Sequence, residues 1–357
     1  MRIAWVVPGG VDESGRDRVI PVLLWTLERL AADHEVHVFT LSQEPRPRSY
    51  RLLGADVHNM GEVTSPIPGG GFLRQASWLR RSLAAYGPFD VLHAFWASPC
   101  GALAVAAAPR TRLMVSLMGG ELTGLADIGY GCDLVPRERA KVALALTRAA
   151  IVTAPSRALA AVAEARGYQT EILPWGVPPE AFLPPRNVDR PRRLLHAASL
   201  NLVKDQTTLL HAVAHARTRL PDLALTIAGV DTLSGRIQSL ARELGLDVTF
   251  LGQIPSDELR PLFAEADAFV LSSRHEAFCV AALEAAAAGL AVVGTHVGVL
   301  PELGAVTVPP ADPIALGDAI VSALSKRDAL AKVMREAAEG YRIEATVSRL
   351  LDLYQRR

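Results

Sequence analysis

Two glutamates eight positions apart, Glu276 and Glu284, are the side chains whose type and spacing could do chemistry together. Glu276 lies in a polar loop, and Glu284 lies in the alanine-rich run 278–288, whose composition favours a helix. Eight residues correspond to roughly 12 Å of helix rise, so the two carboxylates could not easily share a proton or a metal ion. They could hold opposite ends of one elongated ligand. The alternative is that Glu276 caps the helix and Glu284 is a solvated helix charge.

The elements around this pair are expected to place it at one edge of a parallel sheet. Apolar runs at 268–271 and 290–293 have the length of buried strands, and Gly289 is a natural helix stop. The order strand, loop, helix, strand is typical of a parallel sheet covered by helices. Ligands of such folds bind outside the carboxyl ends of the strands, and anions are favoured where a helix begins, because backbone N–H groups there lack partners. We therefore expect an anionic group near Phe278.

The spacing of these residues resembles the donor-site signature of glycosyltransferase family 4. The pattern Ser-x-x-x-Glu-x-Phe, then Glu-Ala-x-Ala-x-Gly, runs over 272–289, and Gly-x-x-Pro-Glu follows at 298–302. The resemblance implies an α/β protein with the GT-B fold, in which two Rossmann-like doubly wound domains face each other across a cleft. It also implies that Glu276 contacts hydroxyls of the donor sugar and Glu284 contacts the ribose of the nucleotide. The amides of three consecutive residues would hold the diphosphate: Phe278, Cys279 and Val280.

Two positions depart from the pattern of that family. Cys279 stands where the family usually has glycine, so its Cβ narrows the approach of a phosphate. A thiol at a helix start is expected to have a lowered pKa, although we interpret Cys279 as a small structural residue and not as a nucleophile. Ser199 stands where the family usually has an arginine that clamps the diphosphate, whereas Lys204 matches the family's lysine. A missing charge-assisted hydrogen bond, ~1.5–3 kcal/mol, predicts about ten- to a hundredfold weaker affinity or rate unless another cation, such as Arg274, substitutes.

Further candidates follow from the same resemblance. Gly9 and Gly10 correspond to the N-terminal glycine loop near the acceptor and the donor phosphates, and Gly252 corresponds to a position that meets the nucleobase. A tight turn without a ligand is the alternative for the first pair. Neither Gly-x-Gly-x-x-Gly nor a P-loop occurs at that turn, which disfavours a nicotinamide-dependent enzyme. We expect four more residues to contact the acceptor or the donor: Gly119, Gly120, Glu121 and His93. His93 is expected at the end of strand 90–93, and the alternative is that it is a structural histidine.

Composition limits the classes of function. Lys plus Arg equals Asp plus Glu, at 37 each, so a nucleic-acid partner is not expected. Three widely spaced cysteines favour a reducing compartment over a disulfide framework or a zinc site. Apolar runs are too short for a signal sequence or a membrane span, so we expect a cytoplasmic protein. Membrane association is possible through arginines of the first half, as in membrane-associated relatives, but is not expected, since such clusters are usually solvated: Arg46, Arg48, Arg51, Arg74, Arg80 and Arg81.

The chain has the length of two domains, and a proline-rich stretch from Pro174 to Pro185 is the clearest boundary. We expect an N-terminal acceptor-side domain at 1–173 and a hinge at 174–190. A nucleotide-sugar-binding domain follows at 191–340, and a C-terminal helix at 341–357 crosses back to the first domain in the family.

The resemblance to glycosyltransferase family 4 therefore implies a retaining glycosyltransferase with Glu276 and Lys204 as catalytic residues. It would move a hexose from a UDP- or GDP-linked sugar to the hydroxyl of an unidentified acceptor, which could be a small molecule, a glycan or a lipid-linked molecule. No other cofactor and no metal are expected, because no Asp-x-Asp pair occurs. One alternative is a sugar-nucleotide-binding protein with weakened catalysis. The other is an epimerase or phosphorylase on the same fold.

Overall fold

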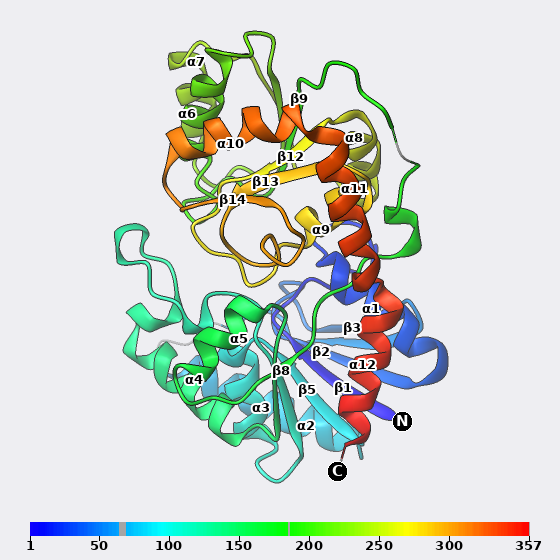
Figure 1. Ribbon diagram of the computed structural model, residues 1–357. Helices are drawn as coiled ribbons and strands as arrows, with labels where there is room; N and C mark the ends of the chain where they lie inside the picture. Colours follow the sequence, from blue (N-terminus) through cyan, green and yellow to red (C-terminus); the bar gives the residue numbers. More distant parts are fainter. Residues whose placement is uncertain (64–68, 185, 357) are drawn as a thin grey trace. The chain divides into compact units, whose positions relative to one another are not determined.

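We describe the protein from a computed structural model, which describes residues 1–63, 69–184 and 186–356 (Figure 1). Residues 64–68 of the expected N-terminal domain lie outside the described residues. So do residue 185 of the expected hinge and residue 357 of the expected C-terminal helix. The chain divides into two compact units. Unit 1 comprises Met1–Pro174 and Thr346–Arg357, and unit 2 comprises Trp175–Ala345.

Unit 1 contains an eight-stranded sheet in the order β3-β4-β2-β1-β5-β6-β7-β8. All neighbouring strands are parallel except β3 and β4. Its strands are β1 (Arg2–Val7), β2 (Glu35–Thr40), β3 (Arg48–Leu52), β4 (Ala55–Asn59), β5 (Val91–Phe95), β6 (Leu113–Ser116), β7 (Ile151–Ala154) and β8 (Glu171–Ile172). Its α-helices are α1 (Pro21–Asp33), α2 (Gly70–Tyr86), α3 (Ala102–Ala107), α4 (Pro136–Arg148) and α5 (Arg157–Glu164), with most of α12 (Ile343–Gln355).

Local sequence explains several of these boundaries. Proline at the first position begins α1 and α4, where a missing N–H costs no hydrogen bond. Ser156 caps α5, and its hydroxyl accepts a hydrogen bond from the Leu159 N–H at 3.2 Å. Strand β3 was not expected, because its two arginines make the segment look polar. Its side chains nevertheless alternate between buried and exposed: Tyr50 and Leu52 are buried, and Arg51 is exposed.

Helix α12 packs on unit 1 through polar groups that reach into its core. The Trp5 indole donates to the Tyr354 hydroxyl at 3.0 Å, and that hydroxyl lies 2.7 Å from Nδ1 of His93. Near the middle of the helix, Arg349 pairs with Glu171 of β8 at 2.6 Å. Figure 1 shows α12 in red beside β1. Most of α12, the last helix of the chain, therefore folds with unit 1, although the rest of that unit comes from the first half of the sequence.

Unit 2 contains a six-stranded, all-parallel sheet in the order β11-β10-β9-β12-β13-β14. Its strands are β9 (Arg193–Ala197), β10 (Ala224–Ala228), β11 (Val248–Gly252), β12 (Ala268–Leu271), β13 (Ala291–Thr295) and β14 (Val306–Val308). Its helices are α6 (Gln206–Arg217), α7 (Arg236–Glu243), α8 (Leu259–Glu265), α9 (Val280–Ala287), α10 (Pro313–Ser325) and α11 (Arg327–Ala338).

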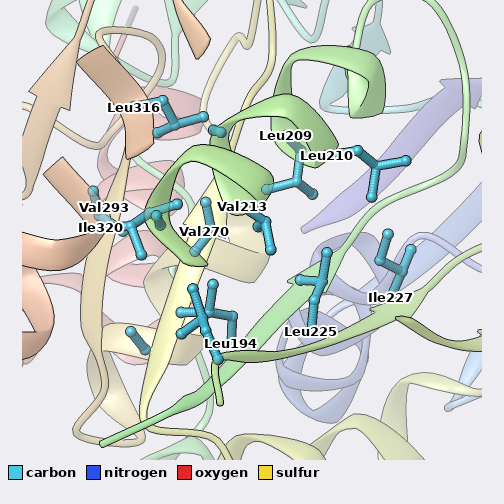
Figure 2. Close-up of a cluster of buried hydrophobic side chains, with 14 of the residues drawn as sticks. Leu194, Leu209, Leu210, Val213, Leu225, Ile227, Val270, Val293, Leu316 and Ile320 are labelled. Atoms are coloured by element: carbon cyan, nitrogen blue, oxygen red, sulfur yellow. The ribbon is translucent and has the colours of Figure 1, made fainter. Parts of the chain in front are cut away.

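The core of unit 2 lies between its sheet and the pair α6 and α10 (Figure 2). Val213 of α6 and Ile320 of α10 meet Val270 and Val293 of the central strands, and all four are almost completely buried. This apolar layer holds the strands rigidly, so the loops at their carboxyl ends have fixed starting points. No helix among the described residues is long and apolar enough to cross a membrane.

Candidate donor site

The candidate site lies at the carboxyl ends of β9 and β12, which are neighbours in the sheet of unit 2. The loop after β9 carries Lys204, and the loop after β12 carries Glu276. Two hydrogen bonds join the loops: the Ser272 hydroxyl donates to the Lys204 carbonyl at 2.8 Å, and the Arg274 N–H donates to the Val203 carbonyl at 2.7 Å. Residues 72 positions apart in sequence are thereby held in one constellation.

Lys204 and Glu276 form an ion pair in which Nζ lies 2.5 Å from Oε1. The Ser273 hydroxyl donates to the same oxygen at 2.7 Å. The two side chains are 24% and 9% exposed, so water screens the pair only weakly. A cation and an anion are therefore available side by side at the strand ends, each held by the other.

Helix α9 begins at Val280, two residues later than the sequence suggested, because Cys279 has φ +79° and ψ +78°. This left-handed region favours glycine, the residue that the family usually has there. Phe278 is buried, and its carbonyl accepts a hydrogen bond from the Val299 N–H at 2.7 Å. The sharp backbone turn at Cys279 thus connects the loop of Glu276 to the first turn of the helix.

The expectation of a lowered thiol pKa at Cys279 is wrong. Burial raises its pKa to about 12, and the nearby Glu276 carboxylate acts in the same direction. Loss of hydration outweighs the attraction of the N-terminus of an eight-residue helix for a thiolate. The thiol therefore stays protonated at neutral pH, in agreement with a structural role.

Glu284 lies two turns into α9 and is half-buried. Burial raises the pKa of its carboxyl to about 8, and Arg260 offsets this only in part. Within the part of the chain that the structure describes, its carboxylate has no hydrogen-bond or salt-bridge partner. A desolvated carboxyl without a partner is well suited to bond a ligand hydroxyl.

The loop of Ser199 is anchored by a buried network that the sequence pattern did not indicate. The Gln206 amide donates to the Ser199 carbonyl at 3.0 Å and lies 3.1 Å from Nε2 of His196. Nδ1 of His196 lies 2.9 Å from the Val270 carbonyl, and burial lowers the pKa of this histidine to about 4. A neutral His196 therefore ties β9 to β12 directly beneath the loop of Lys204.

Gly252 ends β11, and its carbonyl accepts a hydrogen bond from the Gly229 N–H at 2.7 Å. The residue is exposed at the same edge of the sheet as Ser199 and Lys204, since all three follow the carboxyl ends of parallel strands. Unit 2 therefore contains the candidates at 199, 204, 252 and 276–284, and the loops of Lys204 and Glu276 are in direct contact.

In unit 1, Gly9 and Gly10 follow β1. Gly10 has φ +83°, and a Cβ there would lie 2.5 Å from the side chain of Ile20. A close-packed turn therefore suffices to explain glycine at this position. Gly120 is similarly constrained, because a Cβ would lie 2.9 Å from the Tyr130 ring.

Two candidates of unit 1 have structural roles in place of the expected ligand contacts. The buried Glu121 carboxylate accepts N–H hydrogen bonds from Met118 at 3.0 Å, Gly119 at 2.6 Å and Ala97 at 3.4 Å. It therefore holds the loop of Gly119 in shape. Its pKa is raised, mainly by burial. A glutamate that ties its own loop together could not be distinguished by sequence from one that binds a ligand.

His93 does not lie at a strand end, because β5 continues to Phe95. The imidazole is fully buried, and its Nε2 lies 2.7 Å from the Ser116 hydroxyl. Burial lowers its pKa to about 3, so the ring is neutral. His93 is therefore a core residue that is hydrogen-bonded to Tyr354 of α12.

Among the described residues, no group of three His, Cys, Asp or Glu side chains is placed to hold a metal ion.

Comparison with known proteins matches the two halves of the chain to two related families. Residues 22–181 match the model described as Glycosyltransferase Family 4, and residues 181–340 match Glycosyl transferases group 1. The chain belongs to glycosyltransferase family 4. The second match contains the whole constellation of Lys204, Glu276 and Glu284.

Curated relatives of this family 4 protein carry several activities in their names. A D-inositol 3-phosphate glycosyltransferase of Corynebacterium urealyticum is 34% identical over 173 residues, which is 44% of this chain and 41% of the relative. One of Pseudarthrobacter chlorophenolicus is 26% identical over 320 residues, which is 82% of this chain and 76% of the relative. A glycogen synthase of Mycobacterium tuberculosis is 33% identical over 156 residues, which is 42% of this chain and 38% of the relative. The chain thus spans about two fifths of the first and third of these relatives.

Solved structures confirm the expected GT-B fold. Sucrose-phosphate synthase from Thermosynechococcus elongatus has a TM-score of 0.80 at 20% identity and covers 99% of this chain and 98% of its own. An α,α-trehalose-phosphate synthase (UDP-forming) from Burkholderia vietnamiensis has a TM-score of 0.77 at 13% identity and covers 99% and 96%. At these identities the likeness concerns the fold.

Proposed function

We propose that this family 4 protein is a retaining, metal-independent glycosyltransferase that transfers a hexose from a nucleotide-diphosphate sugar to an acceptor hydroxyl. The observation that carries the proposal is the ion pair of Lys204 and Glu276, placed beside the start of α9 and joined to it through a single short loop. A cation, a helix start and a carboxylate are the three groups that a diphosphate and an attached sugar require.

Donor binding would exchange the partners within this pair. A diphosphate carries more negative charge than one carboxylate, so Lys204 Nζ would turn to it, and the Glu276 carboxylate would become available to the sugar hydroxyls. The Ser273 hydroxyl, 2.7 Å from Glu276, would keep that carboxylate in place. Glu284 would accept a hydrogen bond from the ribose, which would compensate its present lack of a partner.

The chemical step breaks the bond between the sugar C1 and the diphosphate oxygen, and the diphosphate leaves with the electron pair. The acceptor oxygen bonds to C1 on the same face, and its proton passes to the leaving phosphate oxygen. Lys204 and the backbone amides at the start of α9 would stabilise the developing negative charge without a metal. No side chain in this scheme acts as the general base.

The donor base is proposed to be uridine or guanosine. One structural neighbour is named UDP-forming, and the name of another describes a complex with UDP-2-fluoro glucose. For the acceptor we propose a phosphorylated polyol or sugar, because the names of several relatives specify D-inositol 3-phosphate. Glycogen synthases among the relatives make a glucan the second acceptor to test.

The test has two stages. Thermal shift with a panel of UDP- and GDP-linked hexoses should identify the donor, since a ligand at a hundred times its Kd stabilises by about 2.7 kcal/mol. Product analysis then follows with D-inositol 3-phosphate, glucose 6-phosphate, a glucan or no acceptor. A glycoside with retained configuration, absent without acceptor, supports the proposal. A changed sugar nucleotide without acceptor indicates an epimerase, and donor binding without any product indicates a binding protein, which Ser199 in place of an arginine favours as the alternative.

A further inference from the structure

The chain passes between the two units at two places, after Pro174 and after Ala345. The segments at these crossings, 174–177 and 341–346, lie side by side, and we call them the crossover pair. The Val177 N–H donates to the Tyr341 carbonyl at 2.9 Å, and the Ile343 N–H donates to the Val177 carbonyl at 2.9 Å. The Thr346 hydroxyl donates to the Pro174 carbonyl at 2.9 Å. The two segments are therefore hydrogen-bonded to each other along their length.

Gly176 makes this contact close. A Cβ at this position would lie 2.6 Å from backbone atoms of Arg342 and Ile343. The two segments touch through their backbones, so no flexible side chain absorbs a displacement between them.

Tyr341 connects the crossover pair to the candidate donor site. Its ring packs against the ring of Phe278, with centroids 6.0 Å apart and planes 54° apart. Its hydroxyl donates to Oε2 of Glu302 at 3.2 Å. Glu302 belongs to the turn whose Val299 N–H bonds the Phe278 carbonyl at 2.7 Å. One residue thus contacts both loops at the start of α9 and, through its own carbonyl, the crossover pair.

We propose that Tyr341 is a positioning residue that couples occupancy of the donor site to the crossover pair. The inference rests on the proposed function, because it takes the diphosphate of a nucleotide sugar to bind beside Phe278. Binding there changes the positions of the Phe278 ring and the turn 299–302, and Tyr341 is in contact with both. A bound donor thereby stabilises the hydrogen bonds of Val177 and Ile343.

The experiment follows amide hydrogen exchange of Val177 and Ile343 by mass spectrometry of the full-length protein, with and without UDP-glucose or GDP-mannose, whichever raises the melting temperature. Energetic coupling between two sites typically amounts to about 5- to 150-fold. We therefore expect exchange of these amides to slow about fivefold or more in the wild type on donor binding. Y341L should abolish the slowing, and Y341F, which keeps the ring but not the hydroxyl, should keep part of it.

Y50F is the matched control, because it removes a buried tyrosine hydroxyl, bonded to the Val11 carbonyl at 2.6 Å, that belongs to neither loop. Its donor-induced slowing should equal that of the wild type. Equal slowing in Y341L and wild type overturns the inference, and so does a wild type that binds donor without slowing at Val177 and Ile343. If no sugar of the UDP- and GDP-linked panel shifts the melting temperature of the wild type, the proposed function itself is contradicted, which distinguishes the two failures.

Discussion

Lys204 Nζ lies 2.5 Å from Oε1 of Glu276, although the family resemblance assigns the two residues to different parts of a donor, the diphosphate and the sugar. The pair keeps each charge compensated before a ligand arrives, which matters because an unpaired, largely buried charge is costly. It also holds both side chains at the same edge of the sheet. Under the proposed function, this ion pair would open when the donor binds.

The first prediction concerns this pair. K204M should lower kcat/KM at least about a hundredfold, because loss of a charged hydrogen bond to the leaving diphosphate removes about 3 kcal/mol in the transition state. It should also lower the free energy of unfolding by about 1–3 kcal/mol, since Glu276 loses its counter-charge. The double variant K204M/E276Q should regain part of that stability and none of the activity. Urea unfolding measures the stability, and initial rates measure the activity. The control is K332A, which replaces an exposed lysine. Equal rates in K204M and K332A would contradict a catalytic role for Lys204.

The second prediction concerns Glu284 and pH. Its pKa is raised to about 8 in the folded protein, above the unfolded value of about 4.3. The folded state therefore binds the proton more tightly, and this contribution to stability is complete below about pH 4 and is lost as pH rises through 8. E284Q should remove that loss, so that its unfolding free energy exceeds that of the wild type by about 1 kcal/mol or more at pH 8.5 and by little at pH 4. Urea unfolding at both pH values checks this, and an equal difference at both would refute it.

The third prediction concerns the strained backbone at Cys279. A residue with a Cβ in the left-handed region costs about 1–2 kcal/mol, and glycine avoids that cost but loses more entropy on folding. C279G should therefore stay within about 1 kcal/mol of the wild type in stability and bind the donor at least as tightly. C279V should lose about 2 kcal/mol or more and weaken donor binding, because a β-branched side chain tolerates this conformation poorly. Thermal unfolding and donor titration of both variants decide the matter; a fully stable C279V would show that the strain is absent.

The fourth prediction concerns the arginine that Ser199 replaces. S199R should strengthen donor binding about tenfold, because it adds one charge-assisted hydrogen bond to the diphosphate. S199A serves as the control and should bind the donor as the wild type does. Calorimetric titration with the nucleotide sugar gives both constants. Unchanged affinity in S199R would indicate that another cation, for which Arg274 is the candidate, already supplies that contact.

The fifth prediction concerns the attachment of α12. Y354F leaves the Trp5 indole N–H without its acceptor and Nδ1 of His93 without its hydrogen-bond partner in the core of unit 1. Each buried unsatisfied group costs about 1–3 kcal/mol, so we expect a loss of about 2–4 kcal/mol in the unfolding free energy. Y168F, at a half-exposed tyrosine, should lose less than 0.5 kcal/mol, roughly the effect of ordinary surface changes. Equal stability of the two variants would contradict this account of how α12 is held.

Residue order alone predicted the two-unit α/β architecture and proposed the residues of the candidate donor site. The apolar runs that became β12 and β13, the alanine-rich helix between them and the spacing of Glu276 and Glu284 are local features, and local propensity is enough to predict them. Only the tertiary structure decided which of the candidate polar residues form hydrogen bonds within the protein. Glu121 and His93 lie near glycine loops and strand ends in sequence. In the structure, backbone N–H groups donate hydrogen bonds to Glu121, and His93 is hydrogen-bonded to Tyr354, which is 261 positions away. The pairing of Lys204 with Glu276 and the contact of Tyr341 with Phe278 also depend on packing of distant segments, which no local pattern records.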